Sequence, residues 1–316
     1  MPARVLHLAH LRWFTEGLHV VSRPLSMAQG IAALALVGGG FYAASRLAGL
    51  SRAIEQRLDR ALTAYVPWAR TAVGIAMGAG LLMACRAGDI VTPEHHAVST
   101  FWLFVELYAG ISWVLGFLTP LGSLLAIALY VPMVAHSGPV AVLEHLELLG
   151  AAVFLAFGGR GRWSLDGLLE FTRRGFDTRA DWPGRMFEFL TGMSLVVVGL
   201  TEKLLDLGMA EAFLRKCPWN FLAPYGLGND WFITLIGASE VLIGLLIACN
   251  VMTRLTVAAV LGMMALTAVL LGPMEVAGHL FAAGLVACVW LRPRTHAATT
   301  ATSAASEAPA AMEGAA

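Results

Sequence analysis

Residues 101–136 read FWLFVELYAGISWVLGFLTPLGSLLAIALYVPMVAH, and Glu106 is the single Asp, Glu, Lys or Arg among them. A helix needs about 20 mostly apolar residues to cross the hydrocarbon core of a bilayer. This stretch is long enough for two crossings, and the Gly116–Pro120 region between them favours a turn. It therefore predicts two transmembrane helices, at about 97–118 and 120–136.

The rest of the chain has the same character. Its 316 residues are 58% hydrophobic and 13% charged, and the mean hydropathy is +0.72. Soluble domains carry about 25% charged residues, so we expect a polytopic, all-α integral membrane protein with the lipid bilayer as its surroundings. A net charge of zero argues against nucleic acid as a partner. Four cysteines without a CxxC motif argue against a disulfide framework, and no metal site is expected.

Eight segments after residue 68 are long and apolar enough to span. An earlier apolar run, 27–44, is shorter and rich in glycine, and it is either a ninth span or a helix lying in the membrane interface. The last residues, 295–316, have the composition of a disordered tail. The eight predicted spans are 69–86, 97–118, 120–136, 139–158, 185–205, 231–250, 254–271 and 274–291.

Arginines predict the orientation. They concentrate in 45–70, in the 159–185 loop and after residue 291, all of which fall on one side of eight spans. The positive-inside rule places that side, and the C-terminus, in the cytoplasm of a bacterial inner membrane. If 27–44 spans, however, Arg4, Arg12 and Arg23 lie on the opposite side, against the rule.

A shift of 134 residues aligns the core of the two halves without a gap. The matched residues are the mid-span carboxylates Glu106 and Glu240, the Gly-Pro turns at 138–139 and 272–273, and the histidines His145 and His279. An even number of spans in each half makes such repeats parallel. The chain is thus expected to hold an N-terminal extension with one apolar helix (1–67) and two parallel four-helix units (68–181 and 182–294).

Several short motifs resemble the DoxX/DoxD family of small four-helix membrane proteins. The first unit has Glu106-x3-Gly110-x5-Gly116 and ends in Gly159-Arg160-Gly161-Arg162-Trp163-Ser164-Leu165-Asp166, which is similar to the family's closing G-x-G-x-x-S-L-D signature. The second unit has Gly199-Leu200-Thr201-Glu202-Lys203-Leu204, similar to the G-x-x-x-K-L end of the family's first helix. It departs from the pattern where it ends without Ser-Leu-Asp, and the first unit has Arg86 near the place of the lysine.

The resemblance implies a role near membrane redox chemistry, because family members are associated with thiosulfate:quinone oxidoreductase and with terminal-oxidase complexes. It suggests a membrane subunit of a quinone-linked oxidoreductase or respiratory assembly, with quinone as the cofactor and a partner redox protein supplying the electron donor site. A non-enzymatic scaffold or assembly factor is the alternative, and a small-solute or metal transporter is a third.

A buried carboxylate near the bilayer centre marks function or a specific partner. Glu106 and His145 fall at similar depth from the same side, and Glu240 and His279 repeat this geometry. We therefore expect two Glu–His hydrogen-bonded pairs, as proton-handling catalytic residues beside a quinone. A purely structural pairing and ligation of a metal or haem are the alternatives.

Other polar residues have simpler interpretations. Glu144 and Glu147 are expected on a solvated rim, and Glu202 with Lys203 as an interfacial pair. With Arg86, that pair is alternatively an entry site for an anionic substrate. Cys85 and Cys217 fall on the same side and could form a disulfide. Glu94-His95-His96 is expected in an exposed loop. His7, His10 and His19, with Glu16, lie on an amphipathic stretch where interfacial histidines are expected, and metal binding is only the alternative at both places.

Overall fold

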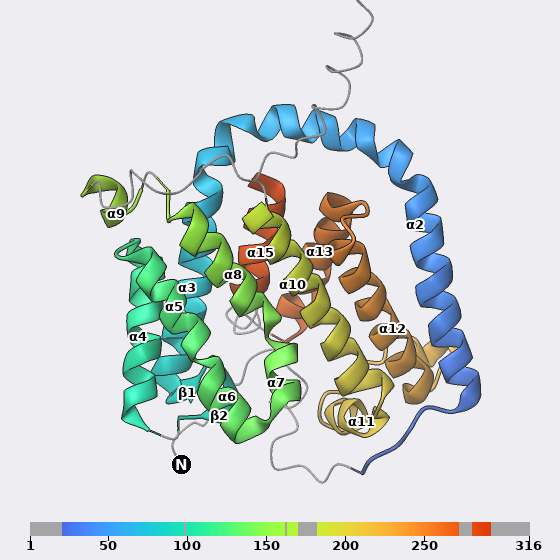
Figure 1. The fold of residues 1–316 in the computed structure, drawn as a ribbon. Helices are drawn as coiled ribbons and strands as arrows, with labels where there is room; N and C mark the ends of the chain where they lie inside the picture. Colours follow the sequence, from blue (N-terminus) through green and yellow to red (C-terminus); the bar gives the residue numbers. More distant parts are fainter. Residues whose placement is uncertain (1–20, 98, 162, 170–181, 272–279, 292–316) are drawn as a thin grey trace, which may run out of the picture.

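The computed structural model describes residues 21–97, 99–161, 163–169, 182–271 and 280–291. Most of them are helical, and the rest form loops and a two-stranded antiparallel hairpin, β1 (Asp89–Ile90) and β2 (Thr92–His96). Figure 1 shows the helices side by side in one molecule. We call the end with the β1–β2 hairpin and α11 the hairpin end, and the opposite end, with residues 159–166, the closing end.

Helix α2 (Met27–Leu62) runs along α12 and then arches over the closing end toward the short 3₁₀ helix η1 (Thr63–Trp68). Its first part packs Ala33 and Val37 against Val241 of α12. Its second part carries the arginine-rich sequence, and Arg254 Nη1 donates to the Glu55 carbonyl there. The apolar run 27–44 is therefore the first part of one longer helix.

The first half of the chain continues through helices that are interrupted twice. One break, at Leu129, separates α5 from α6, and the other, at His145, separates α7 from α8. The predicted span 139–158 is thus two helices, and 97–118 is shorter than predicted. The elements are α3 (Ala69–Ala87), α4 (Thr100–Leu115), α5 (Thr119–Ala128), α6 (Tyr130–Ser137), α7 (Pro139–Glu144), α8 (Leu146–Gly158) and the single turn α9 (Leu165–Leu168).

In the second half, α10 ends in one turn of π-helix, η2, before the loop at the hairpin end. The elements are α10 (Trp182–Gly199), η2 (Leu200–Leu204), α11 (Leu207–Lys216), η3 (Ala223–Tyr225), α12 (Asn229–Ala248), α13 (Thr253–Leu271) and α15 (Leu280–Leu291).

The helices contact one another in two closed rings. In the first, α3 packs on α4, α4 on α5, α5 on α8 and α8 on α3; in the second, α10, α12, α13 and α15 follow one another in the same way. The rings meet where α8 packs on α10 and where α15 packs on α3. Phe187 of α10 and Cys288 of α15 belong to the core of the first ring, so the two halves share one hydrophobic interior.

Glycines set the closest helix crossings. A Cβ on Gly78 of α3 would lie 2.7 Å from the Gly110 carbonyl of α4. A Cβ on Gly192 of α10 would lie 2.5 Å from the Gly244 carbonyl of α12. Gly74 and Gly80 of α3 also lie close to neighbouring side chains, as expected for glycines at helix crossings.

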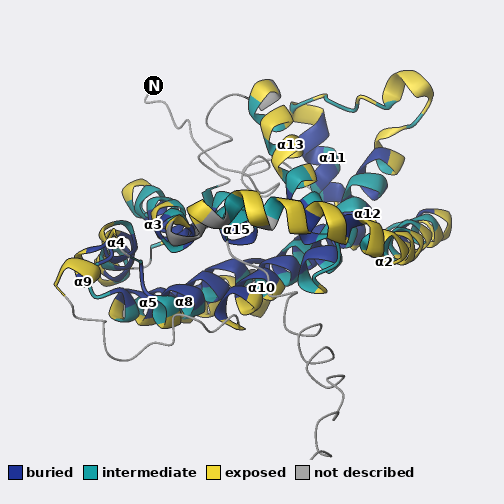
Figure 2. Ribbon diagram, turned by 90° about the horizontal axis from the view of Figure 1, so that it is seen from above, coloured by how far each residue is buried: buried dark blue, intermediate teal, exposed yellow. Residues whose placement is uncertain are grey.

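Four helical stretches are long and apolar enough to cross a membrane, and α2 is one of them. Large apolar side chains, such as Leu34 (75% exposed) and Phe104 (64% exposed), lie on the outside of the bundle. Figure 2 shows this exposed covering, most clearly along α2. Such a surface suits lipid better than water, so the chain is a helical membrane protein. The four stretches are Met27–Leu62, Thr119–Ser137, Trp182–Leu204 and Asn229–Ala248.

Candidate functional site: buried polar clusters at the hairpin end

The break between α7 and α8 lies at His145, whose backbone (φ −120°, ψ 30°) leaves the helical path. Tyr130 of α6 fills the gap in the hydrogen bonding: its hydroxyl donates to the His145 carbonyl and accepts from the Leu149 N–H. A broken helix is tolerated at membrane depth only where such partners replace the lost backbone bonds. Neither glycine nor proline occupies the break, so nothing in the local sequence marks it.

The break brings His145 and Glu147 together. His145 Nδ1 lies 3.2 Å from Glu147 Oε1, and both residues are buried. Glu147 Oε2 lies 2.5 Å from the Ser194 hydroxyl of α10. Glu144, also buried, accepts from the Thr201 hydroxyl at 2.7 Å. These five residues form a cluster between the two rings, which we call the central cluster.

The expected solvated rim at Glu144 and Glu147 is therefore wrong. That expectation assumed a continuous helix, in which residue 145 points away from 144 and 147. The interruption changes the direction in which the following side chains point, and the carboxylate that contacts the His145 ring is therefore that of Glu147. The hydrogen bond of Glu106 comes instead from the Val91 N–H, at 2.7 Å. The structure thus pairs His145 with a different glutamate from the one predicted.

A second cluster lies at η2 and α12. Lys203 Nζ is 2.7 Å from Glu240 Oε2 and 3.9 Å from Glu202 Oε2. Lys203 and Glu202 are 8% and 1% exposed, so the expectation of a solvent-facing interfacial pair is wrong. Both residues lie in the π-turn, from which Lys203 reaches Glu240 of α12. Pairing of Glu240 with His279 stays a prediction, because His279 lies outside the described residues.

Glu106 forms a third site, beneath the β1–β2 hairpin. It is fully buried, and its Oε2 has no hydrogen-bond partner. Asp89 of β1 is buried nearby and accepts a hydrogen bond from His96 Nδ1 at 2.5 Å. Asp89 was not anticipated from the sequence, because the stretch after α3 gives no alternating pattern that would predict strands.

The family-like closing segment has a structural role at the opposite end. Asp166 accepts from the backbone N–H groups of Leu118 and Thr119, which caps the start of α5. Arg160 donates to the carbonyls of Trp113 and Val114, which caps the end of α4. Burial lowers the pKa of Arg160 to about 10. The motif therefore fastens α4, α5 and the 159–166 segment together and lies far along the bundle from the central cluster.

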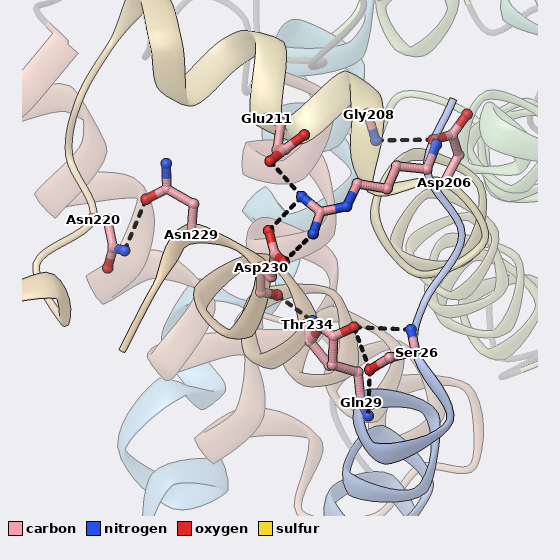
Figure 3. A network of polar contacts seen from close by, with 10 residues as sticks. Ser26, Gln29, Asp206, Gly208, Glu211, Asn220, Asn229, Asp230 and Thr234 are labelled. Carbon is pink, nitrogen blue, oxygen red and sulfur yellow. Dashed lines mark hydrogen bonds and ion pairs between the residues drawn. The ribbon is translucent and has the colours of Figure 1, made fainter. Parts of the chain in front are cut away.

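An N-terminal strap, residues 21–26, fastens the hairpin end (Figure 3). The Arg23 guanidinium binds Glu211 of α11 at 2.9 Å and Asp230 of α12 at 2.5 Å. Partial burial raises the pKa of Asp206, but hydrogen bonds from the Arg23 and Gly208 N–H groups and from Ser22 outweigh it, and the pKa lies below its ordinary value. Arg23 thus forms ion pairs with acidic side chains of both α11 and α12.

The remaining predicted residues take no part in these clusters. Arg86 is exposed at the end of α3. The predicted Cys85–Cys217 disulfide is wrong, because both thiols are free and Cys85 Sγ donates to the Leu103 carbonyl. The Glu94-His95-His96 stretch belongs to strand β2 rather than to an open loop. The N-terminal histidines His7, His10 and His19, with Glu16, lie outside the described residues.

Comparison with family models, with curated proteins and with solved structures finds no match for this chain.

Proposed function

We propose that the chain is a membrane subunit of a quinone-linked oxidoreductase or respiratory assembly, in which it handles protons within the bilayer. The observation that carries the proposal is the central cluster, a buried imidazole–carboxylate pair held in a helix break between two rings of apolar helices. The resemblance of the chain's motifs to the DoxX/DoxD family is the reason for choosing redox chemistry among the possible uses of such a pair.

The chemistry of a quinol supports this choice. Oxidation of a quinol removes two electrons and releases two protons, so groups that accept protons are needed beside it. His145 and Glu147 are such groups, since an imidazole titrates near neutral pH and its bound carboxylate stabilises the charged ring. The Ser194 hydroxyl on Glu147 extends the hydrogen-bonded chain to α10. We assign the electron donor site to a partner protein.

The same proposal includes two parallel repeats of four helices. The two rings follow the same order of helices, and each has its closest crossing at a glycine pair, Gly78–Gly110 or Gly192–Gly244. Thr119 and Thr253, which match in the 134-residue register, both begin the third helix of their ring. An experimental structure in which 68–166 and 182–292 fail to superpose would contradict the repeat.

The test of function uses the purified full-length protein with a short-chain quinone and thiosulfate as donor. We expect turnover only when a partner copurified in mild detergent is present, and we expect Glu147→Gln to abolish it while the folded yield is unchanged. Gln keeps a carbonyl acceptor but cannot take a proton, so it separates chemistry from packing. Full turnover in Glu147→Gln would contradict a proton-handling role for the central cluster.

A non-enzymatic scaffold is the second candidate, and one observation favours it. Both Glu147 oxygens have partners inside the protein, as in a cluster that serves helix packing alone. Copurification of an oxidase or dehydrogenase whose activity is indifferent to Glu147→Gln would support the scaffold.

A further inference from the structure

Three titratable side chains of increasing burial lie at the β1–β2 hairpin and beneath it. His96 has a side chain that is 66% exposed, and its Nδ1 lies 2.5 Å from Asp89 Oδ1. The Asp89 side chain is 3% exposed. Glu106 is completely buried. The series therefore descends from an exposed imidazole through a buried aspartate to a glutamate inside the bundle.

The hairpin turn connects the last two members of the series. Val91 forms the whole turn with φ at +63°, a left-handed conformation that a β-branched side chain rarely adopts. Its N–H donates to Glu106 Oε1, so Glu106 holds the strained turn that carries Asp89 two residues earlier. Asp89 and the Cys85 thiol both lie close enough to Glu106 to interact with it electrostatically.

One oxygen of Glu106 remains available. Oε1 is occupied by Val91, whereas Oε2 is buried without a partner. A proton can therefore be held on Oε2 without loss of the contact that keeps the turn in place. The neighbouring Thr92 hydroxyl is likewise buried without a partner, so polar atoms that lack internal bonds gather beneath this hairpin.

The second ring has a glutamate, Glu240, that corresponds to Glu106 but has a different neighbour. Glu106 and Glu240 each precede their crossing glycine, Gly110 or Gly244, by four residues. Asp89 follows Gly78 by eleven residues, and Lys203 follows Gly192 by eleven. Glu240 thus accepts from the Lys203 ammonium at 2.7 Å, whereas the acid near Glu106 is Asp89. Two neighbouring acids share protons, but an acid bound to lysine does not.

From these contacts we propose that the β1–β2 hairpin is a proton-exchange site, in which His96 and Asp89 pass protons between water and Glu106 Oε2. The His96 ring accepts a proton from hydronium at Nε2 and releases the proton on Nδ1 to Asp89 Oδ1. Asp89 then gives a proton to Glu106 Oε2, and no electron moves in any step. The proposal rests on the proposed function only for the later use of the proton.

The test is infrared spectroscopy of the full-length protein in lipid nanodiscs, without donor or quinone. The carbonyl band of a protonated Glu106 is identified by its absence from Glu106→Gln, and its rate of shift is followed after transfer to D₂O. We expect Asp89→Asn and His96→Ala each to slow this exchange by about 10²-fold, and we expect added imidazole to restore the rate in His96→Ala.

His136→Ala is the matched control, because His136 is another exposed histidine at the end of α6, and it should exchange at the wild-type rate. If Asp89→Asn fails to fold, the exchange rate of His96→Ala still tests the proposal, because His96 is exposed and its substitution should not affect folding. The absence of a Glu106 carboxyl band, or exchange in His96→Ala at the wild-type rate, overturns the proposal. Because no quinone is present, either result is independent of the turnover assay on Glu147.

Discussion

At the scale of single residues, the polar clusters at the hairpin end differ in how many acidic and basic side chains they contain. Lys203 stands between two carboxylates, Glu202 and Glu240. Removing one partner of a buried ion pair leaves an uncompensated charge, which usually destabilises more than the intact pair stabilises. The outcome of a substitution here therefore depends on which charge is left behind.

Lys203→Met should destabilise the protein by about 3–5 kcal/mol, because it removes the cation from a buried carboxylate, Glu202, and a partly buried one, Glu240. Glu240→Gln should cost only about 1 kcal/mol, because the Gln carbonyl still accepts from Lys203 and Glu202 still balances it. Unfolding in detergent, followed by circular dichroism, measures both. The double variant Lys203→Met/Glu240→Leu should recover part of the loss, and equal effects of the two single substitutions would show that Lys203 is not the counter-charge.

At the scale of helices, the crossing of α10 and α12 depends on the absence of a side chain. Gly192→Ala would place a Cβ 2.5 Å from the Gly244 carbonyl, so the helices must separate. We expect a loss of about 1–3 kcal/mol from this overpacking. Gly262 of α13 is the matched control, because a Cβ there meets nothing within 4 Å. Gly262→Ala should be neutral or stabilise by up to about 1 kcal/mol through helix propensity.

The positions of the helices could be predicted because a membrane span depends on the summed hydropathy of about 20 residues, in which no single residue is decisive. The break at His145 could not, since the run Val142–Leu149 contains neither glycine nor proline and the break depends on Tyr130, a tertiary contact. The β1–β2 hairpin escaped prediction for a similar reason: its one-residue turn at Val91 is held by Glu106 of the next helix.

The candidate site was predictable in kind but not in detail. Glu106, His145, Glu240 and Lys203 were recognised as polar residues in apolar surroundings, and the described part of the chain places all four in clusters at one end. Their partners were not predictable, because hydrogen-bond partners depend on helical phase. The break at His145 and the π-turn at 200–204 each change that phase.

The strap couples this end of the molecule to pH. The pKa of Asp206 is depressed in the folded protein, so its contribution is present above the unfolded value of about 3.9 and is lost as pH falls through the folded value. We expect amide hydrogen exchange in residues 21–26, corrected for intrinsic rates, to rise in that acidic range. Asp206→Asn should loosen the strap already at pH 7 and remove the part of the pH dependence that comes from Asp206. A strap equally protected in the variant would contradict this account.

At the scale of the whole molecule, α2 decides the topology. It begins at the hairpin end, beside a strap whose Arg23 pairs with Glu211 and Asp230, and it arches over the closing end with Arg46, Arg52, Arg57 and Arg60. One arginine, Arg23, therefore lies beside the first end of α2, whereas four arginines lie in its second part. The positive-inside rule then predicts that α2 crosses the membrane with its C-terminal part in the cytoplasm.

Reporter fusions test this arrangement directly. Fusions at residue 60 and residue 300 should both give cytoplasmic signals, and a fusion at residue 1 should report the opposite compartment, because one crossing separates residues 23 and 60. Replacing the four arginines of α2 with glutamine should weaken the preference, since the charge bias orients the flanking spans. Arg215→Gln, at the hairpin end, serves as the control and should leave all three signals unchanged. A cytoplasmic signal at residue 1 together with one at residue 60 would mean that α2 lies along the membrane surface, and the arrangement proposed for the hairpin end would then be wrong.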